Sequence, residues 1–532
     1  MSYSKFIDRC ALKNLKAAYQ SLISLENLKG LTNDKALERI GQLIDLSLDL
    51  QKTNGLKHAI KLSKELQKRR LTARQLATSH YFLANAWANL RALSRTENKL
   101  WDWEQKEMEK EIIHLRMALH ENGAHELPDA RVCQILTNLG NLLDHVGRFV
   151  EAIEYWDRAL KRLPSFAMAR GNRGVGLIGY AKALYDQGHK SVLLKRAHTD
   201  LKTALLSELH KDARKIFDKD LVWIESVLSS EFIKKDLDLH SFSLGDSEQE
   251  VRYRRWCLDN RLFLNPLNDL GPYPIAACDV LTTPSIAVKI GEGPYYPGYF
   301  NQMKQEFVSA RYQYYEGISS KQQHFSDRDV LLYDTLDYPT YSLAVEKVKS
   351  AFRTAYSLFD KIAYFLNHYL TLSIKPKKVY FKTLWYTQQR KKRYLKSDFQ
   401  GRKNWPLRGL FWLSKDLYEP DFKEFIEPDA QAIYEIRNHL EHKYLKLHGD
   451  LWKGSSKIKN NVSLVLVDTL AFSISRREFE SKTLKLLKLV RAALIYLSLG
   501  IHCEEYRRAK ERGPDKIVPG IQLGIWKNEW KV

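Results

Sequence analysis

The stretch LTNLGNLLDHVGRFVEAIEYWDRALKRLP, Leu136–Pro164, decides the fold of the N-terminal half of this 532-residue chain. Its apolar residues recur every three to four positions, which predicts two amphipathic α-helices. Small and large residues stand at fixed places: Leu139, Gly140 and Leu143 on the first helix, and Ala152, Trp156 and Ala159 on the second. Pro164 ends the second helix, because proline cannot continue an α-helix. The stretch therefore predicts one closely packed helix pair.

The spacing of these residues resembles the tetratricopeptide repeat. Weaker versions of the pattern occupy Leu37–Leu66, Arg170–Tyr185, and Tyr81–Leu90 together with Glu111–Leu119. One helix pair cannot bury its apolar face alone, so we expect the pairs to stack into an α-solenoid over residues 1–235. The resemblance implies that a protein or peptide partner binds the concave side of the solenoid.

The character of the sequence changes near Leu239. Pro, Gly and Asn become frequent and the helical period is lost, until it returns at Asn301–Tyr315. We predict a connecting segment over residues 236–336, first irregular and then helical. Residues 337–532 are predicted to form a second helical domain, with long helices at Ala344–Leu372, Asp429–Leu447 and Glu478–Leu499, the last ending before Gly500. The predicted fold class is mainly α, a solenoid followed by a helical bundle.

The charge of the chain is strongly positive. Its formal net charge is +22 and its isoelectric point is near 9.4. Such an excess attracts polyanions, above all nucleic acid. An acidic lipid surface, an acidic protein partner, or charge that serves solubility alone would give the same balance.

A basic segment between Lys375 and Lys403 is interleaved with aromatic residues. The predicted RNA-binding residues are Lys377, Lys378, Lys382, Arg390, Lys391, Lys392 and Arg393. The rings among them are Tyr380, Phe381, Trp385, Tyr386, Tyr394 and Phe399. Cations for phosphates and rings for unpaired bases are the side chains that a single-stranded nucleic-acid surface needs. The alternative is a solvated loop whose aromatic residues pack into the core.

Several classes of protein are disfavoured by what the sequence lacks. The cysteines (Cys10, Cys133, Cys257, Cys278 and Cys503) are scattered with no C-x-x-C pair, which argues against a disulfide framework or a zinc site. No apolar run suits a signal peptide or a membrane span. No P-loop, H-E-x-x-H pattern or acidic cluster with metal-ligand spacing occurs. We therefore predict a cytoplasmic protein that uses no metal and no cofactor, and a metal-dependent or phosphate-transfer enzyme is poorly supported.

The stretch EIRNHLEHKYLKLH, Glu435–His448, concentrates polar residues on one predicted helix. At 100° per residue, Ile433, Ile436, Leu440 and Leu447 cluster on one side, with Tyr444 at the edge of that cluster. Arg437, Asn438, Glu441 and His442 fan across the other side, where the pairs Arg437–Glu441 and Asn438–His442 are four residues apart and can touch. A solvated charged helix would give the same wheel, so spacing alone does not separate it from an active site.

The residues RNHLEHKY resemble the R-x4–6-H motif of HEPN-domain proteins. LFDKIAYFLN, Leu358–Asn367, resembles the leading helix of that family, and the resemblance covers about the C-terminal 190 residues. The repeats, LFLNPLND and QMKQEFVSARYQYY resemble one architectural branch of the superfamily. Most active HEPN members are metal-independent RNases, commonly with a composite site across a dimer. The resemblance therefore implies an endoribonuclease that forms a homodimer, because a single good motif is present.

The resemblance gives roles to residues whose chemistry suits them. Arg437 would offset charge on the phosphoryl group, Asn438 would orient the phosphate or the imidazole, and His442 would transfer a proton. RNA carries its own nucleophile, so the products should have 2′,3′-cyclic phosphate and 5′-hydroxyl ends, and DNA should resist. Glu441 is interpreted as an ion-pair partner of Arg437, with a catalytic base as the alternative. His439 is interpreted as incidental.

Two further points stay open in the sequence. The arrangement His442-x-Tyr444 resembles HEPN toxins in which the Tyr is adenylylated by a nucleotidyltransferase, and here such a modifier or antitoxin would be a separate protein; a packed Tyr is the alternative. A toxin or antiviral-defence role is implied by the resemblance, with the repeats sensing a partner or trigger. The competing function is a non-catalytic adaptor that dimerises or binds nucleic acid or nucleotide.

Overall fold

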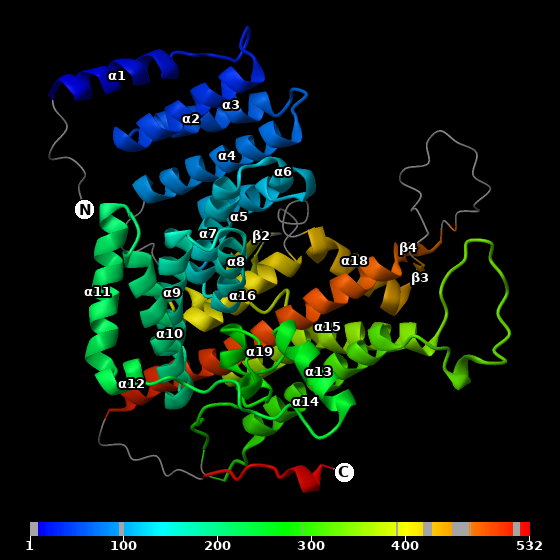
Figure 1. The fold of residues 1–532 in the computed structure, drawn as a ribbon. Coiled ribbons are helices and arrows are strands. Elements are labelled where there is room, and N and C mark those ends of the chain that lie inside the picture. Colours follow the sequence, from blue (N-terminus) through cyan, green and yellow to red (C-terminus); the bar gives the residue numbers. More distant parts are fainter. Residues whose placement is uncertain are drawn as a thin grey trace.

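The computed structural model describes residues 9–94, 101–289, 291–389, 392–418, 428–449, 468, 470–513 and 522–531. These residues are mainly helical, with two small two-stranded sheets, as Figure 1 shows. The predicted fold class, a helical solenoid followed by a helical bundle, is confirmed. None of the helices within the described ranges is long and apolar enough to cross a membrane.

The N-terminal region is built from consecutive helices that stack side by side (Figure 1). They are α1 (Arg9–Ile23), α2 (Asn33–Asp49), α3 (Thr53–Leu66), α4 (Ala73–Ser94), α5 (Lys106–Ala118), α6 (Glu121–Glu126), α7 (Asp129–His145), α8 (Phe149–Arg162), α9 (Ala167–Ala183), α10 (Gln187–Leu205), α11 (Lys211–Val227) and α12 (Ser230–Lys234). Neighbours pack as pairs, most extensively α4 with α5, α7 with α8, and α9 with α10. The predicted helix pairs are present, and their assignment to the tetratricopeptide family stays a prediction.

Gly140 allows α7 and α8 to approach each other closely. A Cβ atom at this position would lie 2.5 Å from Nε1 of Trp156, whose side chain is fully buried. The Trp156 indole donates a hydrogen bond to Oδ1 of Asn141 at 3.1 Å, which fixes the ring against the helix. The small and large residues of the repeat pattern are therefore complementary in space.

Gly140→Ala is expected to destabilise the protein by about 1–3 kcal/mol, because the added methyl group overpacks a rigid aromatic contact. Gly298→Ala is the matched control: this glycine lies in a helix with nothing within 4 Å of its Cβ position. There alanine should be neutral or stabilising by up to about 1 kcal/mol, from helix propensity alone. Urea denaturation of both variants measures the difference, and equal effects would contradict the close packing.

The C-terminal region starts with α13 (Glu248–Asp259) and an irregular segment with short 3₁₀ turns at Pro266–Asp269 and Pro274–Ala276. The longer elements that follow are α14 (Tyr295–Ser319), α15 (Leu343–Tyr369), β1 (Tyr386–Gln389), β2 (Lys392–Leu395), α16 (Trp405–Tyr418), α18 (Pro428–His442), β3 (Leu445–His448), β4 (Phe472–Ser475) and α19 (Arg476–Arg512). β1 and β2 are antiparallel, and β3 and β4 are parallel. α14 and α15 form a long hairpin against α19.

Two predicted helix ends were wrong. The helix expected to reach Leu447 ends at His442, and the chain continues as β3, because Leu447 accepts a hydrogen bond from the backbone of Thr340 and β3 pairs with β4. α19 continues through Gly500 instead of ending before it. Asn404 donates to the Gly500 carbonyl at 2.8 Å, so this glycine serves a close contact with α16 rather than a helix stop.

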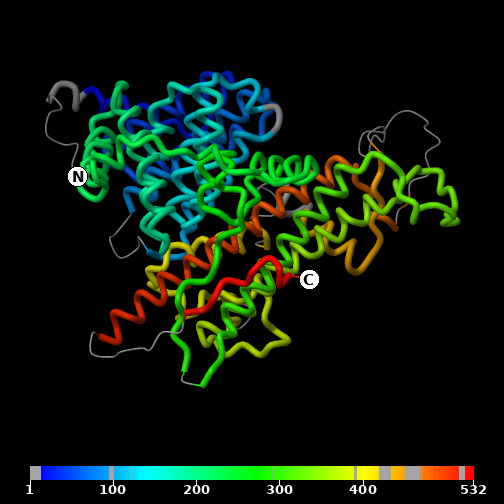
Figure 2. Tube along the Cα trace, turned by 60° about the horizontal axis from the view of Figure 1, so that its bottom comes forward, coloured from blue at the N-terminus to red at the C-terminus, as the bar shows by residue number. Residues whose placement is uncertain are grey.

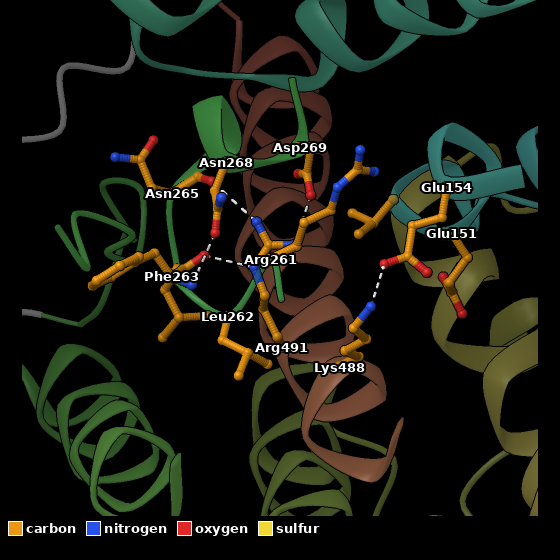
Figure 3. A network of polar contacts seen from close by, with 12 residues as sticks. Glu151, Glu154, Arg261, Leu262, Phe263, Asn265, Asn268, Asp269, Lys488 and Arg491 are labelled. Carbon is orange, nitrogen blue, oxygen red and sulfur yellow. Dashed lines mark hydrogen bonds and ion pairs between the residues drawn. The ribbon is translucent and has the colours of Figure 1, made fainter. Parts of the chain in front are cut away.

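The LFLNPLND segment holds the middle of α19 through Arg491 (Figure 3). The guanidinium group of Arg491 forms an ion pair with Asp269 at 2.6 Å and donates to the carbonyls of Phe263 and Asn265. Arg491 and Asp269 are both fully buried. One turn away on α19, Lys488 pairs with Glu154 of α8 at 3.1 Å. The irregular segment is therefore ordered and binds the middle of α19 through buried polar contacts.

The repeat helices and the C-terminal helices share one apolar core. α19 runs between the repeats and the α14–α15 hairpin in both views (Figures 1 and 2). A single cluster of buried apolar residues extends from Ala77 to Ile501, and a second one covers the N-terminal helices from Tyr19 onward. The predicted division at residues 235 and 336 stays a prediction, whereas the core is continuous across both positions.

A buried ionic contact joins α16 to the repeats. Asp416 of α16 accepts from Arg116 of α5 at 2.9 and 3.0 Å, and it also pairs with Arg148. The preceding residue on α16, Lys415, pairs with Glu109 of α5. Burial by itself would raise the pKa of Asp416, but the two guanidinium groups lower that pKa to about 2. The carboxylate is thus fully ionised inside the protein.

Candidate active site

The helix α18 carries the Arg437 motif and packs against α15, α16 and α19. Ile433 and Ile436 are fully buried in this contact, and Leu440 is half-buried. The apolar side predicted for this helix is therefore the side that faces the core. Leu447, which the helical wheel placed on the same side, is buried through β3 instead.

Arg437 is half-buried and is held in place by groups from neighbouring elements. Its guanidinium carbon lies 5.6 Å from the centre of the Tyr356 ring on α15, and its Nη1 donates to Oδ1 of Asn438 at 3.2 Å. Tyr356 in turn contacts Tyr418 of α16 with a ring separation of 6.3 Å. Three helices thus fix the orientation of the arginine.

The Asp360 carboxylate lies close enough to Arg437 to interact with it electrostatically. Burial raises the pKa of Asp360, while a hydrogen bond from the Phe381 backbone N–H and the positive charge of Arg437 oppose the rise. Burial also raises the pKa of Tyr356 to about 12, so its hydroxyl stays protonated at neutral pH. The surroundings of Arg437 are therefore polar without a direct carboxylate contact in the described residues.

The interpretation of Glu441 as the partner of Arg437 was wrong. Glu441 pairs with Arg353 of α15 at 3.4 Å, and Arg353 also donates to the Leu440 carbonyl at 3.1 Å. The side chains are about two-fifths exposed, so solvent weakens this ion pair. The pairing directs Glu441 toward α15 and leaves the Arg437 guanidinium to Tyr356 and Asn438.

His442 is the last residue of α18 and is exposed. It follows Arg437 by five positions, which places the two side chains about 140° apart around the helix axis. His439, one turn earlier, is packed: its ring stacks on Phe472 at 4.9 Å and its Nδ1 contacts the Glu435 carbonyl at 2.8 Å. Of the two histidines, His442 is the one that solvent and a ligand can reach.

Tyr444 is exposed and lies between α18 and β3. Its ring is 5.4 Å from the ammonium group of Lys446, and its hydroxyl interacts with that of Tyr341. The sequence placed Tyr444 at the edge of the apolar side of a helix. In the structure Tyr444 lies outside α18, and its side chain is exposed.

Two polar residues of β3 were not identified from the sequence. Lys446 is buried between Asp337 at 2.7 Å and Asp468 at 2.9 Å, and the buried His448 contacts the Asp337 carbonyl and Ser473. Both anchor β3 to segments distant in sequence. The sequence pattern indicated a helix for this stretch, because a strand of four residues is too short to show a clear alternation of polar and apolar residues.

The predicted basic surface divides into exposed cations and partly buried rings. Lys377, Lys378, Lys392 and Arg393 are exposed and Lys382 is half-buried, whereas Arg390 and Lys391 lie outside the described residues. Among the rings, Tyr380 and Tyr394 are exposed, but Phe381, Trp385 and Phe399 are fully buried. The core alternative thus holds for three of the rings, which pack around Trp103 from the repeats or around Phe359.

The basic segment is anchored next to the Arg437 site. The backbone N–H of Phe381 donates to Oδ1 of Asp360 at 2.9 Å, and Asp360 interacts with Arg437. The backbone between Tyr380 and Lys382 is therefore bound to the carboxylate that interacts with Arg437. In the described part of the chain no three His, Cys, Asp or Glu side chains converge as metal ligands.

Comparison with known protein families identifies the class of this domain. Residues 287–504 match the family model described as LA2681-like HEPN. The chain therefore contains a HEPN domain, and this domain includes α14, α15, α16, α18 and most of α19. The match begins before the predicted boundary at residue 337 and covers α14 as well as α15. No curated protein matches the chain.

Proposed function

We propose that the chain is a metal-independent endoribonuclease whose active site is built around Arg437, Asn438 and His442. The observation that carries this proposal is the state of Arg437: its guanidinium group is oriented by Tyr356 and Asn438, next to a lysine-rich segment. The presence of a HEPN domain supports an RNase or nucleotide-binding role in general. The arrangement around Arg437 suits a phosphoryl group.

In the proposed reaction the 2′-hydroxyl oxygen of RNA attacks the adjacent phosphorus, and the bond from phosphorus to the 5′-oxygen breaks. Arg437 stabilises the charge that develops on the phosphoryl oxygens, through two parallel N–H donors. His442 gives a proton to the leaving 5′-oxygen or takes one from the 2′-hydroxyl. The products are a 2′,3′-cyclic phosphate and a 5′-hydroxyl.

A homodimer would complete this site. Arg437 and His442 point to different sides of α18, so one copy of the helix does not direct both at one phosphate. Two copies of α18 that meet across a two-fold axis would bring Arg437 of one to His442 of the other. Light scattering of the purified protein measures the oligomeric state.

The helical repeats are proposed to bind a protein or peptide partner or trigger. They share a buried core and ion pairs with α16 and α19, so a ligand bound to them acts on the HEPN domain through direct contacts. We propose a toxin or antiviral-defence effector, with a separate antitoxin or nucleotidyltransferase as a further partner that would modify Tyr444. Adenylylation of Tyr444 would place a bulky anion beside His442. Mass spectrometry of the protein would detect this modification.

The alternative is a non-catalytic adaptor that binds nucleic acid or nucleotide and dimerises. The half-buried position of Arg437 against Tyr356 favours it, since a packed arginine can serve stability alone. The test incubates wild type and variants with labelled total RNA in EDTA. Cleavage with cyclic-phosphate ends supports the nuclease, and toxicity on overexpression that survives Arg437→Ala and His442→Ala would support the adaptor.

Arg437→Lys is expected to lower the cleavage rate by about 10²- to 10³-fold, because lysine keeps the charge but not the bidentate fork. Arg353→Lys is the matched control, since Arg353 lies on the adjacent face of α15 and pairs with the exposed Glu441. Its rate should stay within a few-fold of wild type. Single-turnover rates on one defined RNA measure both, and equal losses would contradict the role of Arg437.

A further inference from the structure

A strip of aromatic side chains, three exposed and one half-buried, crosses the surface where α14 begins and α15 ends. We define the tyrosine strip as Tyr295, Tyr299, Tyr364 and His368. Tyr295 and His368 meet edge to face at 5.5 Å, and Tyr299 and Tyr364 do so at 6.1 Å. Tyr295 is 41% exposed and Tyr364 is 47% exposed, so ring faces remain open to a ligand.

The strip has a fixed framework and a shallow hollow. Tyr296 lies half-buried beneath it and its hydroxyl contacts Nδ1 of His368 at 2.9 Å. Glu292, Gly293, Tyr295 and His368 line an open depression of about 360 Å³. The Tyr295 hydroxyl donates to Glu292 at 3.0 Å. Rings held at defined angles lose little conformational entropy when a flat ligand stacks on them.

The strip is continuous with the Arg437 site along α15. Arg353, Asp360, Tyr364 and His368 lie within about 80° of one another around the helix. Asp360 interacts with Arg437, and His368 is two turns further, about 12 Å along the axis at 1.5 Å per residue. This distance corresponds to three to four stacked nucleotides at roughly 3.4 Å each.

Positive charge flanks the strip. Asn367, next to His368, binds Ile374 through both its amide oxygen and its amide nitrogen, which folds the chain back against the end of α15. Lys375, Lys377 and Lys378 follow directly and are exposed. Two carboxylates near the strip already have partners: Glu292 accepts from Tyr295, and Glu306 pairs with Lys361.

We propose that the tyrosine strip stacks the unpaired bases of single-stranded RNA while Lys375, Lys377 and Lys378 hold its phosphates. The inference rests on the proposed function, because it makes the strip a substrate-docking surface of the same nuclease. Exposed rings combined with a basic rim suit unpaired bases, which every sequence presents. A duplex hides its base faces and is excluded.

The test measures binding of a fluorescein-labelled 12-nucleotide oligouridine by anisotropy, with full-length protein carrying His442→Ala to prevent cleavage. Tyr295→Leu combined with Tyr364→Leu is expected to weaken binding by about 10- to 100-fold, with an unchanged salt dependence. Lys377→Ala combined with Lys378→Ala should lower both the affinity and the salt dependence. Tyr333→Leu, at a tyrosine that is 91% exposed on a different segment, is the control.

An abasic RNA of the same length separates stacking from charge. Abasic RNA should bind the protein with an intact strip as weakly as oligouridine binds the Tyr295→Leu, Tyr364→Leu variant. Equal binding of oligouridine and abasic RNA would overturn the proposal. So would an affinity of the leucine variant for oligouridine equal to that of Tyr333→Leu. Absence of any RNA binding would also overturn it and would favour a protein partner for the rings. Cleavage is measured separately, on protein with His442 intact. Cleavage without strip-dependent binding refutes the strip alone, and strip-dependent binding without cleavage refutes the nuclease alone.

Discussion

His442→Ala is expected to lower the rate of RNA cleavage by about 10²- to 10⁴-fold, the usual contribution of a positioned general acid or base. His442 is the accessible histidine of α18, since it is exposed at the end of the helix. A histidine side chain can give or take a proton as a general acid or base, whereas alanine can transfer no proton. Single-turnover cleavage of a defined RNA in EDTA measures the effect, with the cyclic-phosphate ends scored on the products.

Two histidine controls make this result specific. His439→Ala removes a ring that stacks on Phe472, so it should reduce thermal stability and leave the rate per folded molecule within a few-fold of wild type. His210→Ala alters an exposed histidine that caps α11 in the repeats, so it should leave the cleavage rate per folded molecule unchanged. If His442→Ala cleaves as fast as His210→Ala, the proton-transfer role of His442 is excluded.

Asp416→Ala is expected to destabilise the protein by about 3–5 kcal/mol. Asp416, Arg116 and Arg148 are all less than one-tenth exposed, so the substitution removes the buried carboxylate from Arg116 and leaves Arg148 with Glu151 alone. The contact joins α16 to the repeats, so the loss should separate the two halves as well as weaken them. Urea denaturation measures the free energy, and limited proteolysis detects the separation.

Asp129→Ala is the matched control, because Asp129 pairs with Arg162 at 2.6 Å on the surface. The loss there should stay below about 1 kcal/mol. The pKa of Asp416 is held at about 2, below its unfolded value, so its contribution is complete at neutral pH and fades as the pH falls toward 2. Equal losses of unfolding free energy in the two alanine variants would contradict a stabilising role for the buried Asp416 ion pairs.

The sequence predicted the helices whose apolar period is long. The pairs around Leu136–Pro164, the α15 helix and the apolar side of α18 at Ile433 and Ile436 all occur in the structure. The HEPN resemblance, carried by RNHLEHKY and LFDKIAYFLN, is matched by the family model over residues 287–504. These features are local, because helix formation and an apolar stripe depend on residues three and four positions apart.

The surroundings of the candidate site were not predictable in the same way. Glu441 was assigned to Arg437 from their spacing, yet it pairs with Arg353, which is 88 residues away in the sequence. The same limit applies to the basic segment, where Phe381 and Trp385 are core residues while Tyr380 is exposed. A four-residue spacing shows that two side chains can touch, but a competing partner on another helix decides which contact forms.

The sequence by itself determined the helical class and the repeated helix pairs, and it singled out the candidate site residues, because each follows from local periodicity or from a compact motif. Only the tertiary structure decided that α18 stops at His442, that α19 continues through Gly500, and that Arg437 rests on Tyr356. These outcomes depend on hydrogen bonds and packing between segments far apart in the chain. The free energy of each such contact depends on two elements at once, so the sequence of either element alone does not reveal it.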